Sequence, residues 1–121
     1  MERIELTNGV RIEVEDKSTL LSGELHMVHL TVTFSVALDE GDVELRRYCP
    51  AGRLGITRAL NKPGVHAREL GEVKRALKDS FIATNKAYME HPKFVDRFKH
   101  TCLARFKEEE EKARKAAIHE K

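Results

Sequence analysis

The longest regular pattern in the chain is the alternation of apolar and polar residues from Met27 to Leu38. Its apolar positions are Val28, Leu30, Val32, Phe34, Val36 and Leu38. A period of two with β-branched and aromatic side chains is typical of a strand with one buried face. We therefore predict the central strand of a sheet whose apolar face is covered by helices. At about 3.3 Å per residue it would be roughly 40 Å long, so a β-bulge or strong twist is expected.

The beginning of the chain carries the pattern of a β-hairpin. Short alternating runs lie on both sides of Asn8-Gly9, which is a strong turn signal. A two-residue loop would place the aliphatic side chains of the two strands on opposite faces. A three-residue loop from Thr7 to Gly9 instead pairs Ile4 with Ile12 and places them on one face. We therefore predict a type I turn followed by Gly9 in the left-handed region, which forms a G1 bulge.

The segments around the central strand are shorter. Residues 16–26 are mostly polar and predict a connection that is pinned to the core by its leucines, which are Leu20, Leu21 and Leu25. The acidic turn at 39–42 is expected to cap a short helix from Val43 to Tyr48. A fourth strand is predicted over 54–60, and Pro63-Gly64 is expected to close it.

The apolar period changes from two to 3.6 near residue 66. The first stripe consists of Leu70, Val73, Leu77, Phe81, Thr84 and Tyr88, and the second of Phe94, Val95, Phe98, Cys102 and Phe106. Between them, His91-Pro92 breaks the helical pattern. We predict helices over 67–90 and 92–117. From about residue 107 the stripe thins to alanines, and Glu–Lys and Glu–Arg pairs at i, i+4 predict a helical tail in solvent.

These elements predict an α+β fold: a three- or four-stranded, mostly antiparallel sheet with two C-terminal helices packed on one face. The 121 residues are expected to form one domain, with a sheet-rich part at 1–66 and a helical part at 67–121. No segment approaches the roughly 20 apolar residues that span a membrane, and no targeting signal precedes the hairpin. We therefore expect a soluble cytoplasmic protein with no membrane partner.

Charge is divided along the chain. Residues 1–45 hold 3 Lys/Arg and 10 Asp/Glu, whereas residues 46–78 hold 9 and 2. The basic segment is a candidate anion or nucleic-acid patch, made of Arg46, Arg47, Arg53, Arg58, Lys62, Arg68, Lys74, Arg75 and Lys78. Its run from Gly52 to Gly55 fits the G-x-x-G pattern of one class of RNA binders, but Tyr48 is the only aromatic residue for stacking. Alternatively, the acidic and basic segments neutralise each other within the fold or across a dimer.

Catalytic and metal-binding motifs are missing from the sequence. It shows no nucleophile elbow, phosphate loop, zinc-protease motif or dinucleotide fingerprint, so we expect no cofactor and lean against an enzyme. Cys49 and Cys102 have neither disulfide-framework nor zinc spacing and are predicted to be two buried thiols. The remaining alternative is an enzyme or metal site assembled from distant residues, such as both cysteines and one histidine.

Two patches resemble a group of small bacterial proteins with no assigned activity. The first patch is Leu6-x-Asn8-Gly9 followed by Asp16-x-Ser18 and Gly23; the second is Tyr88-x-x-x-Pro92-x-Phe94-x-x-Arg97-Phe98. The group also has a tryptophan just after the position of Gly23, which this chain lacks. The resemblance implies an α+β fold and transfers no catalytic residue.

A small sheet with exposed edges favours a protein-interaction role. We expect a non-enzymatic module that forms a homodimer or docks to a protein partner. The candidate self-association face is the polar side of the central strand, which consists of His29, Thr31, Thr33 and Ser35. The leading alternative is nucleic-acid binding through the basic segment 46–78.

Overall fold

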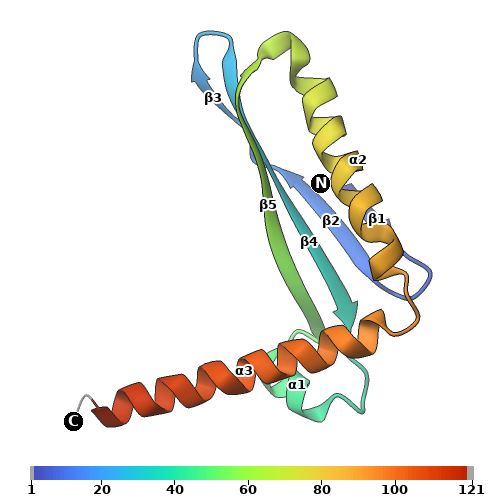
Figure 1. The fold of residues 1–121 in the computed structure, drawn as a ribbon, viewed down its shortest axis with the longest axis vertical. Helices are drawn as coiled ribbons and strands as arrows, with labels where there is room; N and C mark the ends of the chain where they lie inside the picture. Colours follow the sequence, from blue (N-terminus) through green and yellow to red (C-terminus); the bar gives the residue numbers. More distant parts are fainter. Residues whose placement is uncertain (1, 120–121) are drawn as a thin grey trace.

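The computed structural model describes residues 2–119, in which strands precede two long helices. The elements are β1 (Glu2–Glu5), β2 (Arg11–Asp16), β3 (Thr19–Ser22), β4 (Leu25–Ala37), α1 (Val43–Tyr48), β5 (Arg53–His66), the 3-10 turn η1 (Ala67–Glu69), α2 (Leu70–Met89) and α3 (Phe94–His119). The predicted α+β class is confirmed, with an antiparallel sheet followed by two C-terminal helices (Figure 1).

Strand β4 is the centre of the sheet, as predicted. β2 and β3 pair with one edge of β4 and β5 pairs with the other, while β1 extends the sheet beyond β2. The sheet has five strands rather than three or four, because Thr19–Ser22 forms β3 instead of an irregular connection. Ser22 pairs with Leu25 around a tight turn in which Gly23 has a φ of 55°, a conformation that glycine adopts without strain.

The leucines of the β3–β4 hairpin do not pin it to the core, so that prediction is wrong. Leu20, Leu21 and Leu25 are 62%, 51% and 44% exposed. The hairpin extends past the end of β2, which pairs with β4 only from Leu30 onward, and it stands apart from α2 (Figure 1), so these side chains have no layer to pack against.

The β1–β2 hairpin has the predicted register. Ile4 pairs with Ile12, the Leu6 N–H donates to the Val10 carbonyl (2.8 Å) and the Gly9 N–H donates to the Leu6 carbonyl (3.1 Å). Gly9 has a φ of 87°. The requirement that the aliphatic side chains share one face therefore identified the turn correctly.

Strand β5 continues through Pro63-Gly64, where we predicted that it would end. Lys62 pairs with Val28 and Val65 with His26, so two residues of β5 lie opposite one residue of β4. This is the bulge expected for so long a strand pair. Proline is tolerated there because β5 is an edge strand and the bulge removes the need for its N–H.

The core lies between the sheet and the helices. Val10, Ile12, Val28 and Val32 are fully buried on the covered face of the sheet, and α2 contacts β4 and β5 on that face. The predicted α2 stripe is incomplete at its end, since Tyr88 is 63% exposed while Met89 is buried.

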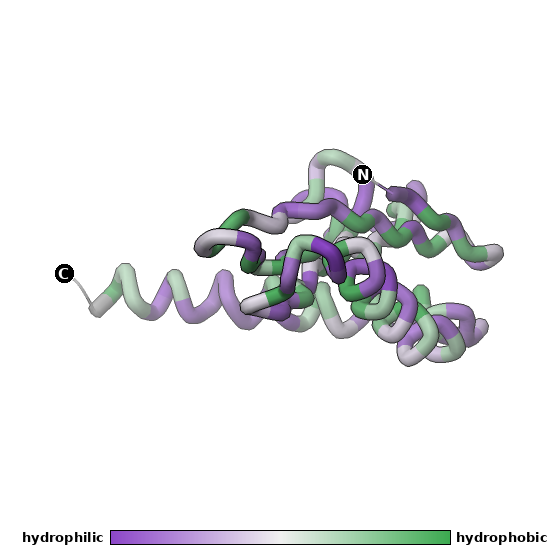
Figure 2. The backbone as a smooth tube through the Cα atoms, turned by 90° about the horizontal axis from the view of Figure 1, so that it is seen from above, coloured by the Kyte–Doolittle hydropathy of each residue, from purple (hydrophilic) through white to green (hydrophobic). Residues whose placement is uncertain are grey.

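Helix α3 packs only through its first half. Phe98 lies against Phe34 of β4, with ring centroids 5.8 Å apart, and Phe106 stacks on Tyr48 of α1. Beyond Phe106 the helix extends away from the sheet as a mostly hydrophilic arm, on the side where β5 is the outer strand (Figures 1 and 2). The solvated tail predicted from about residue 107 is thus observed.

The acidic turn before α1 works differently from the prediction. Asp42 is the N-cap residue, but its side chain makes no capping hydrogen bond to the helix. Its carboxylate instead accepts from the Asp39 N–H (2.9 Å) and from the Lys99 ammonium of α3 (2.7 Å). The turn therefore ties α1 to α3.

Among the described residues, none of the helices combines the length and the apolar composition needed to span a membrane.

Candidate protein-interaction site

The outer edge of β5 is the longest unpaired strand edge in residues 2–119. β5 has 14 residues and pairs with β4 alone, whereas the opposite edge strand, β1, has only 4. In Figure 1, β5 runs along the whole length of β4, and the strand pairing leaves its other edge without a neighbour among residues 2–119. An edge of this kind offers a row of main-chain donors and acceptors to another strand.

The hydrogen-bond phase of the ladder shows which residues of β5 face outward. The Leu38 N–H donates to the Gly52 carbonyl (2.9 Å), so residues 38 and 52 form a hydrogen-bonded pair. Such pairs alternate along an antiparallel ladder, and even-numbered residues of β5 therefore bond to β4. The N–H and C=O groups of Arg53, Gly55, Thr57, Ala59 and Asn61 point away from the sheet.

The opposite side of β4 gives an independent check on this phase. The Lys17 N–H donates to the His29 carbonyl (2.8 Å), so the odd-numbered residues in this part of β4 form their main-chain hydrogen bonds on the β2 side. The even-numbered residues of β4 therefore form theirs with β5. Both observations give the same set of outward-facing residues on β5.

Apolar surface lies beside the edge on the helical face. Ile56 and Leu60 of β5 are only partly buried, and a groove of about 470 Å³ separates β5 from α2. The groove is lined by Lys62, Glu72, Val73, Ala76, Leu77 and Ser80. Among these residues only Lys62 comes from β5, so the groove lies at the Lys62 end of the edge.

The predicted self-association face is brought together on the side of the sheet away from α2. His29, Thr31 and Thr33 are half-buried and Ser35 is 7% exposed. Thr33 and Thr57 share a hydroxyl hydrogen bond (2.8 Å), and the Arg53 guanidinium donates to the Ser35 hydroxyl (3.2 Å). Part of this polar face is thus already satisfied by β5.

The basic segment is not brought together as one patch. Lys74 pairs with Asp16 and Lys78 with Glu2, each at 2.7 Å, beside a hollow of about 390 Å³. Arg46 donates to the carbonyls of Asp39 and Leu38. Arg58, Lys62, Arg68 and Arg75 make no ion pair with the described residues.

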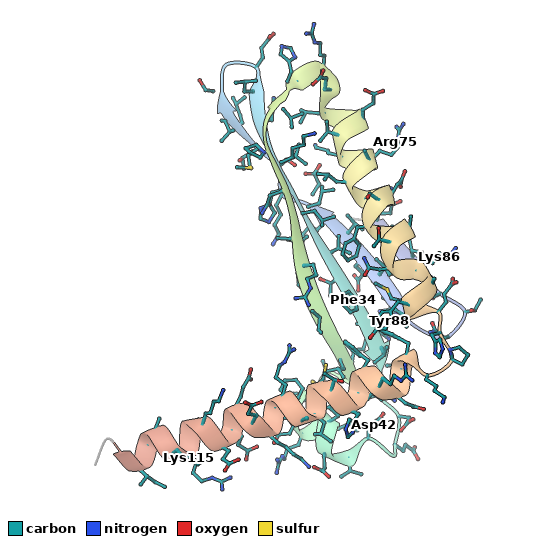
Figure 3. The ribbon with its side chains drawn as sticks, in the orientation of Figure 1. Phe34, Asp42, Arg75, Lys86, Tyr88 and Lys115 are labelled. Atoms are coloured by element: carbon teal, nitrogen blue, oxygen red, sulfur yellow. The ribbon has the colours of Figure 1, made fainter. Side chains whose placement is uncertain are left out.

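Arg47 and Arg75 lie on different elements and face different surroundings. Arg47 lies over the Tyr48 ring and pairs with Glu110. Figure 3 shows Arg75 on the side of α2 away from β5, and Arg75 lines the same hollow as Lys74 and Lys78. The G-x-x-G run forms the turn before β5 and its first residues, where Leu54 is buried. It is therefore a turn leading into a strand, without the helices that flank such a loop in RNA binders.

The Asp16–Lys74 pair perturbs one carboxyl strongly. Partial burial raises the pKa of Asp16, but hydrogen bonds from Lys74 and Ser18 and the Lys74 charge outweigh it and lower the pKa to about 2. A carboxylate held ionised by a neighbouring ammonium serves as a structural anchor, since proton transfer near neutral pH needs a pKa close to 7.

The cysteines have the properties of structural thiols. Cys102 is buried, Cys49 is half-buried, and both are unbridged. Burial raises the pKa of each thiol, which disfavours the reactive thiolate. Within residues 2–119, no three His, Cys, Asp or Glu side chains gather in a way that could hold a metal ion.

The sequence predicted exposed edges for so small a sheet but did not locate this one, because the fourth strand was predicted to end near residue 60. The available signal was the alternation that resumes at Val65 after Pro63-Gly64, combined with the tolerance of edge strands for proline.

No family model matches the chain, and comparisons with curated proteins and with solved structures also give no match.

Proposed function

We propose that the chain is a non-enzymatic module that self-associates by strand addition at the outer edge of β5. The observation that carries the proposal is the row of outward-facing main-chain groups from Arg53 to Asn61, which no strand of residues 2–119 covers. Strand addition to such an edge is a common mode of protein recognition. A second copy of the chain carries the same edge and is the simplest partner.

Hydrogen bonds alone would give two copies little net affinity, because their sum only roughly offsets the cost of association. Each ladder bond contributes about 0.5–1.5 kcal/mol net, while association costs about 4–15 kcal/mol in lost freedom of motion. Apolar contacts have to supply the difference. Ile56 and Leu60 are partly buried beside the edge on the helical face, and the groove between β5 and α2 lies further along β5, at Lys62.

The edge is a better interface than the polar face that includes Thr31 and Thr33. That face offers short polar side chains, and two of its members already bond to Thr57 and Arg53. Covering it would remove water from these groups without supplying new partners, which costs free energy. At the edge, the loss of water is compensated, because the main-chain groups gain hydrogen-bond partners when a second strand pairs with them.

Sedimentation equilibrium over a hundredfold dilution tests the proposal. We expect a reversible dimer of the 13.8 kDa chain. Ala59→Pro removes an outward N–H from the edge and should shift the protein to monomer. Ala59→Val keeps the N–H and is the matched control. Circular dichroism and urea unfolding would verify that both variants fold.

A third variant separates the edge from the polar face. Thr31→Lys places a charge on the face but leaves the edge intact, so we expect it to retain the dimer. A monomer at all concentrations would contradict self-association. Loss of the dimer in Thr31→Lys but not in Ala59→Pro would move the interface to the polar face, because a desolvated unpaired charge costs several kcal/mol.

A further inference from the structure

We infer that two copies pair β5 with β5 antiparallel, in the register that places Thr57 on the two-fold axis. This inference rests on the proposed function and adds the partner strand and its alignment. A two-fold axis perpendicular to the sheet makes the two edges antiparallel and places both α2 helices on the same side of one continuous sheet.

The limits of the open edge define the register. The outward-facing residues run from Arg53 to Asn61, and Thr57 is the middle one. On one side the edge is followed by Pro63, which has no N–H. On the other side Gly52 turns the chain toward α1, with a φ of 81°. Only with Thr57 on the axis does every outward-facing residue gain a partner.

In this register the directly opposed side chains are compatible. On the polar face, Arg53 lies opposite the partner's Asn61 and Gly55 opposite the partner's Ala59. On the helical face, Leu54 lies opposite the partner's Leu60, and Ile56 opposite the partner's Arg58. No like charges face each other, and the partner's partly buried Leu60 lies opposite Leu54, which is itself buried within its own subunit.

The neighbouring registers are worse for identifiable reasons. An axis at Arg58 places that guanidinium opposite its own copy, and like charges directly across a ladder are destabilising. An axis at Ala59 places Gly55 opposite the partner's Pro63, which cannot donate a ladder bond. An axis at Ile56 opposes no like charges but leaves Asn61 without an outward-facing partner.

Disulfide cross-linking distinguishes these registers. Residues opposite each other in a hydrogen-bonded pair have Cα atoms about 5.5 Å apart, within the range of roughly 4.4–6.8 Å that a disulfide spans. Thr57→Cys should therefore form a covalent dimer on mild oxidation. Ala59→Cys should not, because its two copies would lie roughly 13 Å apart, a separation of four residues along the strands.

A second pair of variants tests the ends of the ladder. Arg53→Cys mixed with Asn61→Cys should give a mixed covalent dimer, whereas each variant alone should not. Gly55 is avoided because a Cβ there would lie 3.2 Å from the Cβ of Ser35. Thr7→Cys, in the exposed hairpin turn, reports the rate of cross-linking by collision, and the unmodified chain reports the background from Cys49 and Cys102.

We expect Thr57→Cys to cross-link at least tenfold faster than Thr7→Cys when the protein is at a concentration that gives a dimer by sedimentation. Rapid cross-linking of Ala59→Cys with none for Thr57→Cys would overturn the register while leaving strand addition intact. A sedimenting dimer in which no cysteine on β5 cross-links faster than Thr7→Cys would overturn the register and the edge together. A chain that sediments as a monomer would contradict self-association itself.

Discussion

The side-chain amide of Asn8 donates a hydrogen bond to the main-chain carbonyl of Met89, at 2.6 Å and across 81 residues of sequence. Asn8 lies in the hairpin turn and Met89 is the last residue of α2. The carboxamide oxygen also accepts from the Val10 N–H at 3.3 Å. One side chain therefore shapes the turn and ties it to the end of the helix.

Asn8→Ala should lower the free energy of unfolding by about 1–2 kcal/mol, because it removes both hydrogen bonds and leaves the Met89 carbonyl without its donor. Urea unfolding followed by circular dichroism measures the change. Thr7→Ala, at the exposed neighbouring position, is the control and should be nearly neutral. Equal stability of Asn8→Ala and the unmodified chain would show that the contact contributes nothing.

The two sequence patches used for the family resemblance meet at this contact. Asn8 belongs to the first patch, and Met89 follows Tyr88, which begins the second. Each patch had a local explanation, a turn and a helix break. Their contact could not be predicted because a single sequence records local preferences but not which distant segments lie together.

Asp42 and Lys99 predict a specific pH dependence. The hydrogen bond from Lys99, followed by that from the Asp39 N–H, lowers the pKa of Asp42. A carboxyl with a lowered folded-state pKa stabilises the fold above its unfolded value of about 3.9, and this contribution is lost as the pH falls through the folded-state value.

Asp42→Asn should therefore be destabilised at pH 7, by about 2 kcal/mol, since it removes a charged acceptor from a Lys99 side chain that is only 15% exposed. The difference from the unmodified chain should shrink as the pH falls below about 4. Glu40→Gln changes a nearby exposed carboxyl and should show no such trend. A difference that stays constant with pH would contradict the role of the ion pair.

The two halves of α3 should differ sharply in their contribution to stability. Phe98 contacts Phe34 and Phe94, with ring centroids 5.8 and 5.5 Å away, so Phe98→Ala should cost about 3–5 kcal/mol. Truncation after Lys107 removes residues that are exposed over 108–118, together with the surface contacts of Glu110 to Arg47 and Tyr48, so the urea midpoint should move little. In Figure 3, Lys115 lies on the arm far from the sheet. A large loss on truncation would mean that the arm contacts the core.

Nucleic-acid binding through residues 46–78 is predicted to be absent. Lys74 and Lys78 are paired with Asp16 and Glu2, while Arg58 and Arg75, which make no ion pair with residues 2–119, come from a strand and from a helix. We expect no binding of generic RNA or DNA at micromolar protein in low salt. Binding that weakens with a log–log salt slope near −0.7 to −0.9 per phosphate contact would contradict this expectation.

The fold was more predictable than the candidate site. Strict alternation predicted β4, and the need to keep Ile4 and Ile12 on one face predicted the first turn. The edge depends instead on where β5 ends and on what lies beside it. A Pro-Gly pair such as Pro63-Gly64 ends a strand in most sequences. In the structure, the bulge opposite Met27 lets β5 continue past this pair.

Amide hydrogen exchange at Thr57 and Ala59, resolved by NMR, tests strand addition most directly. Their N–H groups point away from β4, whereas the Arg58 N–H points toward it and serves as the internal reference. As the concentration rises into the range where sedimentation gives a dimer, we expect exchange at Thr57 and Ala59 to slow until it resembles that of Arg58. Rapid exchange at both positions in a fully dimeric sample would contradict the account.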